Sequence, residues 1–158
     1  MSRLLMSDSV GAVVATVMGG LAMTFVGNEE GLRLSRYTDI RGIKTICYGE
    51  TEKAFFDKIY TKKQCDDMLL NRLEEFASNI EKCITKPMSP KTEVAFISLA
   101  YNIGYGRFCK STVAKRYNAG DREGACNAIL LWSRAGSNPK ALIKRRKREQ
   151  MMCLTGLK

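Results

Sequence analysis

The chain has 158 residues, 45% hydrophobic and 27% charged, a balance that excludes intrinsic disorder and suits one compact domain. Lys and Arg total 26 against 16 Asp and Glu, so the net charge is +10 and polyanions are the favoured partners. The absence of histidine excludes Ser-His-Asp and Cys-His nucleophilic sites, HExxH metalloproteases and His-ligated zinc amidases. We therefore expect acid–base chemistry to use carboxylates.

The N-terminal segment from Ser9 to Asn28 carries no charge and has about the length of a membrane-spanning helix. Its glycines and threonines make insertion marginal, so such a helix could leave the membrane again. Arg3 precedes the segment and favours a cytoplasmic N-terminus with the rest of the chain exported. Three interpretations compete, namely a cleaved signal peptide, an uncleaved anchor and a buried core helix, and the core helix is the least favoured.

The six cysteines are well spread along the chain and lack the CxxC pairs of zinc or thioredoxin-like sites. They are Cys47, Cys65, Cys83, Cys109, Cys126 and Cys153. An even number fits up to three disulfides in an oxidising compartment, in a pairing that sequence alone cannot assign. The alternative is a set of small buried thiols in a cytosolic core. An exported chain favours the disulfides.

The rest of the chain shows short β signals followed by helical ones. Residues 34–51 combine glycines with β-branched residues, which predicts a hairpin. A capping box at residues 61–64 predicts the start of an amphipathic helix, and Ser89-Pro90 predicts the next, whose apolar run 94–101 belongs at the centre of the core. The apolar face of the first of these helices is Cys65, Leu69, Leu73, Phe76 and Ile80.

The C-terminal third contains further helix boundaries. The NAGD sequence at 118–121 predicts the end of one short helix and the cap of another that stops near Gly136. Asn138-Pro139 predicts the start of the last helix. Its basic run could bind nucleic acid through phosphate contacts, but a solvated helix face or attraction to anionic envelope polymer explains it as well. Phe108 and Trp132 have the spacing of core residues. Without repeats or linkers, the sequence predicts one α+β domain that is mainly α.

Two carboxylates and a hydroxyl form the candidate catalytic set. A glycosidase needs one protonated carboxyl to donate to the leaving oxygen and one ionised carboxylate to activate water or stabilise the sugar cation. Glu30 and Asp39 are candidates for these tasks, and Thr45 could hold the water. Taken alone, such a pair is more often solvated surface charge.

The string EGLRLSRYTDIRGIKTICYGET, residues 30–51, resembles the catalytic segment of the phage-type lysozymes, glycoside hydrolase family 24. That family's pattern is E-G-x-R-x-x-x-Y-x-D followed by G-x-x-T-x-G-x-G-x-T. The matching residues are Glu30, Gly31, Arg33, Tyr37, Asp39, Gly42, Thr45, Gly49 and Thr51. The stretch 100–112, Trp132 and the Arg145-Arg146 pair ahead of Glu149 also resemble the family, so the similarity spans residues 28–158.

The resemblance implies a lysozyme fold with a small β-hairpin lobe and a helical lobe, which cleaves the β-1,4 bond between N-acetylmuramic acid and N-acetylglucosamine in peptidoglycan. It implies Glu30 as general acid, Asp39 as the residue that assists attack and Thr45 as the hydroxyl that positions water. Glu29 is expected to be a solvated helix-end charge. Cys47 replaces a glycine of the pattern, which suggests a disulfide, the alternative being a free regulatory thiol.

The N-terminal segment is similar to the uncleaved anchor of the signal-arrest-release endolysins, which cause host cell lysis at the end of phage infection. The resemblance favours an anchor in residues 1–27 and a muramidase domain in 28–158. Residues 9–28 would hold the chain at the host inner membrane, on its periplasmic side, until release into the periplasm activates it. No cysteine precedes Cys47, so a thiol of the anchor cannot be the switch.

Two alternatives to a hydrolase remain open. A lytic transglycosylase would cleave the same bond without water, and a catalytically silent cationic protein would only bind the envelope. The presence of Asp39 and Thr45 together favours the hydrolase. We expect a monomer that needs no cofactor or metal and, because the chain is exported, has no nucleic-acid partner.

Overall fold

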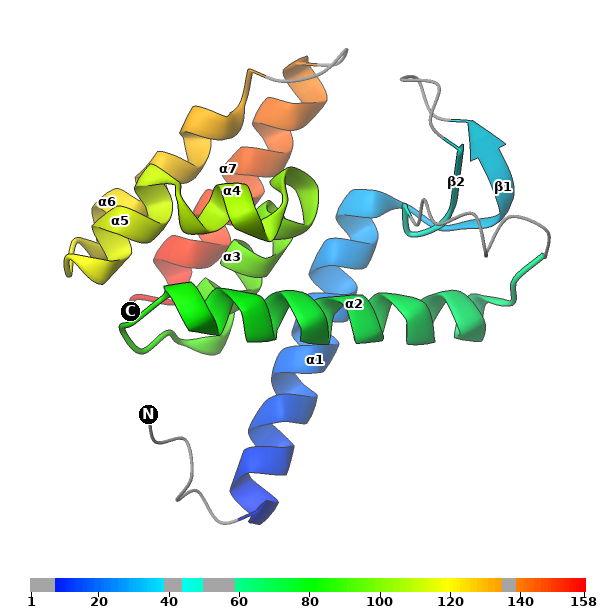
Figure 1. Cartoon of the computed structure of the whole chain (residues 1–158), viewed down its shortest axis with the longest axis horizontal. Coiled ribbons are helices and arrows are strands. Elements are labelled where there is room, and N and C mark those ends of the chain that lie inside the picture. Colours follow the sequence, from blue (N-terminus) through cyan, green and yellow to red (C-terminus); the bar gives the residue numbers. More distant parts are fainter. Residues whose placement is uncertain (1–7, 39–43, 50–58, 135–138) are drawn as a thin grey trace.

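The structure is a computed structural model that describes residues 8–38, 44–49, 59–134 and 139–158. Its elements, in chain order, are α1 (Asp8–Glu30), β1 (Arg33–Thr38), β2 (Lys44–Cys47), α2 (Lys62–Cys83), α3 (Pro90–Ile103), α4 (Tyr105–Cys109), α5 (Thr112–Asn118), α6 (Arg122–Ala128), the 3-10 helix η2 (Ile129–Trp132) and α7 (Pro139–Thr155). Helices dominate and the strands form one small lobe at the side of the helical body (Figure 1). This confirms the predicted α+β class, mainly α.

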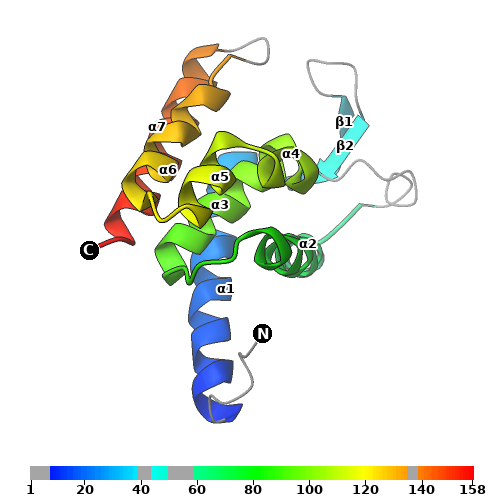
Figure 2. The same ribbon diagram turned by 60° about the vertical axis from the view of Figure 1, so that its left-hand side comes forward.

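Helix α1 contributes its C-terminal half to the core. Ala22 and Val26 are buried where α1 crosses α2 and α3, while the N-terminal half of α1 projects from the body (Figures 1 and 2). The Tyr48 ring packs close to this part of α1, since a Cβ at Gly27 would lie in van der Waals contact with it at 3.5 Å. The interpretation as a core helix, the least favoured by the sequence, therefore describes this half of α1. The expected boundary between residues 27 and 28 falls inside the helix.

Within residues 8–38, 44–49, 59–134 and 139–158, no helix combines the length and the apolar character needed to span a membrane.

The predicted hairpin is present where the structure describes it. Strands β1 and β2 pair antiparallel, with Tyr37 opposite Thr45 and Arg33 opposite Cys47, and the register shifts between these two pairs. The lobe lies beside the C-terminal end of α1, so the chain turns from helix into strand directly after Glu30 (Figure 1).

Helices α2 and α3 begin where their caps predict. The Thr61 hydroxyl accepts from the backbone N–H of Gln64 at 3.2 Å, and the Gln64 side chain accepts from the Thr61 N–H at 2.9 Å. Every residue of α3 from Thr92 to Ala100 is buried, and the ring of Phe96 packs against that of Phe108 at 5.3 Å between centroids. The apolar run therefore forms the centre of the core, as expected.

One helix is shorter than predicted. Asp121 caps α6 by accepting from the Gly124 N–H at 2.9 Å, as expected, but α6 ends at Ala128 rather than near Gly136, which lies outside the described residues. The chain tightens into η2, and the Ser133 hydroxyl donates to the Leu130 carbonyl at 2.7 Å. A 3-10 turn of this kind commonly finishes an α-helix.

The six cysteines form three disulfides, Cys47–Cys65, Cys83–Cys109 and Cys126–Cys153. This confirms the prediction of a disulfide framework. It also excludes the alternative of a free regulatory thiol at Cys47.

Candidate active site

Glu30 is the last residue of α1, and its backbone position follows from its neighbour. Gly31 has φ +72°, a left-handed conformation that favours glycine, and its N–H donates to the Gly27 carbonyl at 3.0 Å. The glycine therefore ends the helix and leaves the Glu30 side chain at its C-terminal rim. The partial negative charge of a helix C-terminus disfavours a carboxylate, so this position requires a compensating cation.

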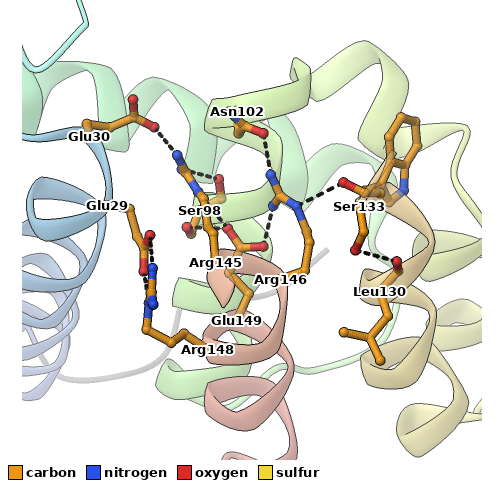
Figure 3. Close-up of polar contacts among 11 residues, drawn as sticks. Glu29, Glu30, Ser98, Asn102, Leu130, Ser133, Arg145, Arg146, Arg148 and Glu149 are labelled. Atoms are coloured by element: carbon orange, nitrogen blue, oxygen red, sulfur yellow. Dashed lines mark hydrogen bonds and ion pairs between the residues drawn. The ribbon is translucent and has the colours of Figure 1, made fainter. Parts of the chain in front are cut away.

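Arg145 of α7 supplies that cation. Its Nη1 lies 2.7 Å from Oε1 of Glu30, and the two side chains are 9% and 18% exposed. Its Nη2 donates to the Ser98 carbonyl at 3.2 Å and its Nε to Oε1 of Glu149 at 3.2 Å (Figure 3). Three contacts fix the guanidinium, so Arg145 fixes one oxygen of the Glu30 carboxylate in turn.

Behind Arg145 lies a second, fully buried ion pair between Arg146 and Glu149. The Ser98 hydroxyl donates to Oε1 of Glu149 at 2.6 Å. Arg146 also donates to the Asn102 side chain and, at 3.2 Å, to the Trp132 carbonyl (Figure 3). Buried charges are tolerated only when paired in this way.

The two arginines of this network respond differently to their surroundings. Burial lowers the pKa of Arg145, but the carboxylates of Glu30 and Glu149 outweigh it, and the pKa is raised overall. Burial lowers the pKa of Arg146, and the nearby Glu149 carboxylate compensates only in part. Arg145 therefore remains a firmly charged partner for Glu30.

The turn after β2 covers the other side of Glu30. A Cβ at Gly49, which has φ +91°, would lie 3.5 Å from Oε2 of Glu30. The preceding Tyr48 is tied to the helices twice, since its hydroxyl donates to Asp66 at 2.6 Å and its carbonyl accepts from the Tyr101 hydroxyl at 3.0 Å. Glu30 thus has Arg145 on one oxygen and a fixed turn near the other.

Glu29 differs from the expectation of a solvated charge. Its side chain is 6% exposed and bound at both oxygens by Arg148, at 2.5 and 2.8 Å. The wrong expectation came from its place at a helix end, where solvation is usual. Both carboxylates therefore point to α7, Glu29 to Arg148 and Glu30 to Arg145 (Figure 3).

Of the other two predicted catalytic residues, Asp39 lies outside the described residues. The backbone of Thr45 lies in β2, opposite Tyr37 and four residues before Gly49. The backbone therefore brings Thr45 to the same lobe as the turn that covers Glu30.

The family model described as phage lysozyme matches residues 27–149, which include Glu30, the hairpin and most of α7. The chain belongs to the phage lysozyme family. Its similarity to members of that family extends over almost the whole chain.

The SAR-endolysin of Bacteriophage PS119 is 36% identical to this chain, over 92% of the chain and 93% of the relative. The SAR-endolysin of Enterobacteria phage P21 is 35% identical, over 96% of the chain and 99% of the relative. Among solved structures, a mutant of P22 lysozyme has a TM-score of 0.75 and 33% identity, and the match covers 85% of this chain and 95% of that one.

The basic run of α7 is a further feature of this phage lysozyme that differs from the sequence-based expectation. Arg145 and Arg146 are buried and Arg148 is paired, so the run is not a uniformly solvated face. The exposed cations of this run are Lys140, Lys144, Lys147 and Arg148. A usable signal was Glu149, three and four residues after the two buried arginines, since this spacing places acid and base on one helix face.

Proposed function

We propose that this chain is a muramidase endolysin that hydrolyses the β-1,4 bond between N-acetylmuramic acid and N-acetylglucosamine in peptidoglycan. The broader part of this statement, a peptidoglycan-lysing endolysin, rests on the family and on relatives that are named endolysins. The assignment as a muramidase is supported by the surroundings of the Glu30 carboxyl group. Arg145 holds one of its oxygens, and the other faces the turn after β2.

In the proposed reaction, Glu30 donates its proton to the bridging oxygen as the bond from that oxygen to C1 of N-acetylmuramic acid breaks. Water held by Thr45 adds its oxygen to C1, and Asp39 accepts the proton that this water loses. One water is consumed, and proton exchange with solvent restores both carboxyls. Arg145 positions the acid by binding Oε1, so that Oε2 is the oxygen available to carry the proton.

The N-terminal segment is proposed to act before catalysis as a signal anchor, with residues 9–28 in the host inner membrane. Ala22 and Val26 fill the core in the present structure and cannot lie in lipid at the same time. An anchored chain would therefore lack this packing, and Glu30 would lack its partner on α7. Release into the periplasm would let α1 dock and complete the site.

Fragment analysis tests the reaction. The full chain is used, because a truncation at residue 28 would remove Ala22 and Val26 from the core. Mass spectrometry of products from purified peptidoglycan should find reducing muramic ends, and the Glu30→Gln variant should release almost none. Anhydro ends would indicate a lytic transglycosylase instead, and no fragments from the folded, oxidised protein would favour a binding protein.

Isolation from cells tests the anchor. The protein should sediment with the inner membrane before depolarisation, move to the periplasm afterwards, and retain its N-terminal residues throughout. A mature protein that begins near Met23 would instead indicate a cleaved signal peptide.

A further inference from the structure

The three disulfides have different positions in the fold. Cys83–Cys109 joins the C-terminal end of α2 to α4, and Cys126–Cys153 joins α6 to α7, so both lie within the helical body. Cys47–Cys65 joins the end of β2 to the first turn of α2. Within the described part of the chain, it is the disulfide that crosses from the hairpin lobe to the helices.

Cys47 has an unusual backbone conformation. Its φ is +55°, and among the described residues it is the one non-glycine residue with a positive φ. A side chain makes this left-handed conformation unfavourable, so the surrounding structure must hold it. The bond to Cys65 provides such a restraint, and both cysteines are buried.

The restraint acts on the turn that covers Glu30. Tyr48 and Gly49 follow Cys47 directly, and a Cβ at Gly49 would lie 3.5 Å from Oε2 of Glu30. Two hydrogen bonds also tie this turn to the helices, one from the Tyr48 hydroxyl to Asp66 and one from the Tyr101 hydroxyl to the Tyr48 carbonyl. A relaxation of φ at Cys47 would redirect the chain at this point and move the turn relative to the carboxylate.

We propose that the Cys47–Cys65 disulfide is a redox-dependent positioning element of the active site, so that full activity requires its oxidation. The inference rests on the proposed function. Reduction consumes two electrons and two protons and converts the Sγ–Sγ bond into two thiols; a dithiol reductant supplies both and becomes a cyclic disulfide. In a reducing cytoplasm, the turn after β2 would therefore be displaced relative to Glu30. Oxidation after export would form the disulfide and fix the position of this turn.

Paired cysteine variants of the full chain test this role. The Cys47→Ala/Cys65→Ala variant removes the restraint and leaves a side chain at the left-handed position. The Cys47→Gly/Cys65→Ala variant also removes it, but glycine adopts a positive φ at little cost. The Cys83→Ala/Cys109→Ala variant is the matched control, because it removes the disulfide at the opposite end of α2.

On purified peptidoglycan, at a temperature where circular dichroism shows each variant folded, the Cys47→Ala/Cys65→Ala variant should lose kcat about 10-fold or more, with a smaller change in KM. The Cys47→Gly/Cys65→Ala variant should recover most of that loss, and the control should stay within about twofold of wild type. Equal loss in the control, or no loss in the Ala/Ala variant, would overturn the proposal.

Hydrogen exchange gives a second readout that does not depend on activity. The amides of residues 46–49 should lose protection in the Ala/Ala variant while those of α3 keep theirs. Unchanged protection at 46–49 would contradict the positioning role. Should oxidised wild type release no fragments, the proposed function fails, and the exchange result still decides whether the disulfide sets the turn.

Discussion

Arg145 of α7 contacts Glu30 of α1 through an ion pair of 2.7 Å, and the two side chains are 9% and 18% exposed. The contact joins the first and last helices of the chain at the proposed catalytic acid. Because Arg145 is held by Glu149 and Ser98 as well, it has little freedom to follow a misplaced Glu30. The buried network therefore fixes Arg145, and Arg145 fixes the position of the Glu30 carboxyl group.

Replacement of Arg145 should reduce catalysis more than it reduces substrate binding. In an Arg145→Gln variant, Glu30 loses its positional restraint, and a displaced catalytic group typically costs about 100-fold in rate. Arg145→Lys keeps the charge but cannot reproduce three directed contacts, so it should fall between wild type and Arg145→Gln. Values of kcat and KM on purified peptidoglycan check this. A loss confined to KM would assign Arg145 to substrate binding instead.

Removal of one partner of the buried Arg146–Glu149 pair should strongly destabilise the fold. A Glu149→Gln variant leaves two buried guanidinium groups without their shared carboxylate, and removing one partner of a buried pair typically costs about 3–5 kcal/mol. Urea unfolding measures the change. Lys147→Gln, at an exposed position of the same helix, is the control and should change stability by about 0.5 kcal/mol or less. Similar losses in both variants would contradict the assignment.

Helix starts could be predicted from the sequence, because the interactions that determine them are local. The capping box at Thr61, Pro90 at the start of α3 and the Asp121 cap each involve residues within one helical turn, and each is present. The core position of the 94–101 run followed from its lack of a polar face.

The partners of Glu30 could not be predicted in the same way. The spacing to Glu149 groups Arg145 with that carboxylate on one face of the helix, but it does not say that this face meets Glu30. That contact depends on the packing of α7 against α3, which brings together residues far apart in the sequence. Burial of Glu29 beside Arg148 depends on the docking of α1 for the same reason.

The phenol of Tyr48 should contribute stability that is lost only in strong alkali. Burial, reinforced by the hydrogen bond to the Asp66 carboxylate and by its charge, raises the pKa of Tyr48 from 10.0 to about 12. A group with a raised pKa in the folded state contributes fully below its unfolded pKa, and the contribution disappears as the pH rises through the folded value.

The difference in unfolding free energy between wild type and Tyr48→Phe should therefore be constant up to about pH 10 and shrink towards about pH 12. Chemical denaturation across this range measures it, and the titration of other groups cancels in the difference. A difference that stays constant to the alkaline limit would show that the phenol is not perturbed in the folded state.

The Glu29–Arg148 pair should contribute modestly, because Arg148 is 54% exposed and solvent screens the interaction. A double-mutant cycle with Glu29→Gln and Arg148→Gln should give a coupling of about 0.5–1 kcal/mol. A coupling near zero would mean that this contact does not stabilise the docked α1.

The most direct test of the central claim compares Glu30→Gln with Glu29→Gln, two neutralising changes at adjacent positions. Both side chains lie at the end of α1, but only Glu30 faces the turn after β2. Fragment release from purified peptidoglycan should fall at least about 100-fold in Glu30→Gln and stay within a few-fold of wild type in Glu29→Gln, because a general acid contributes about 10²–10⁴ in rate. Full activity in Glu30→Gln, or an equal loss in Glu29→Gln, would contradict Glu30 as the catalytic acid.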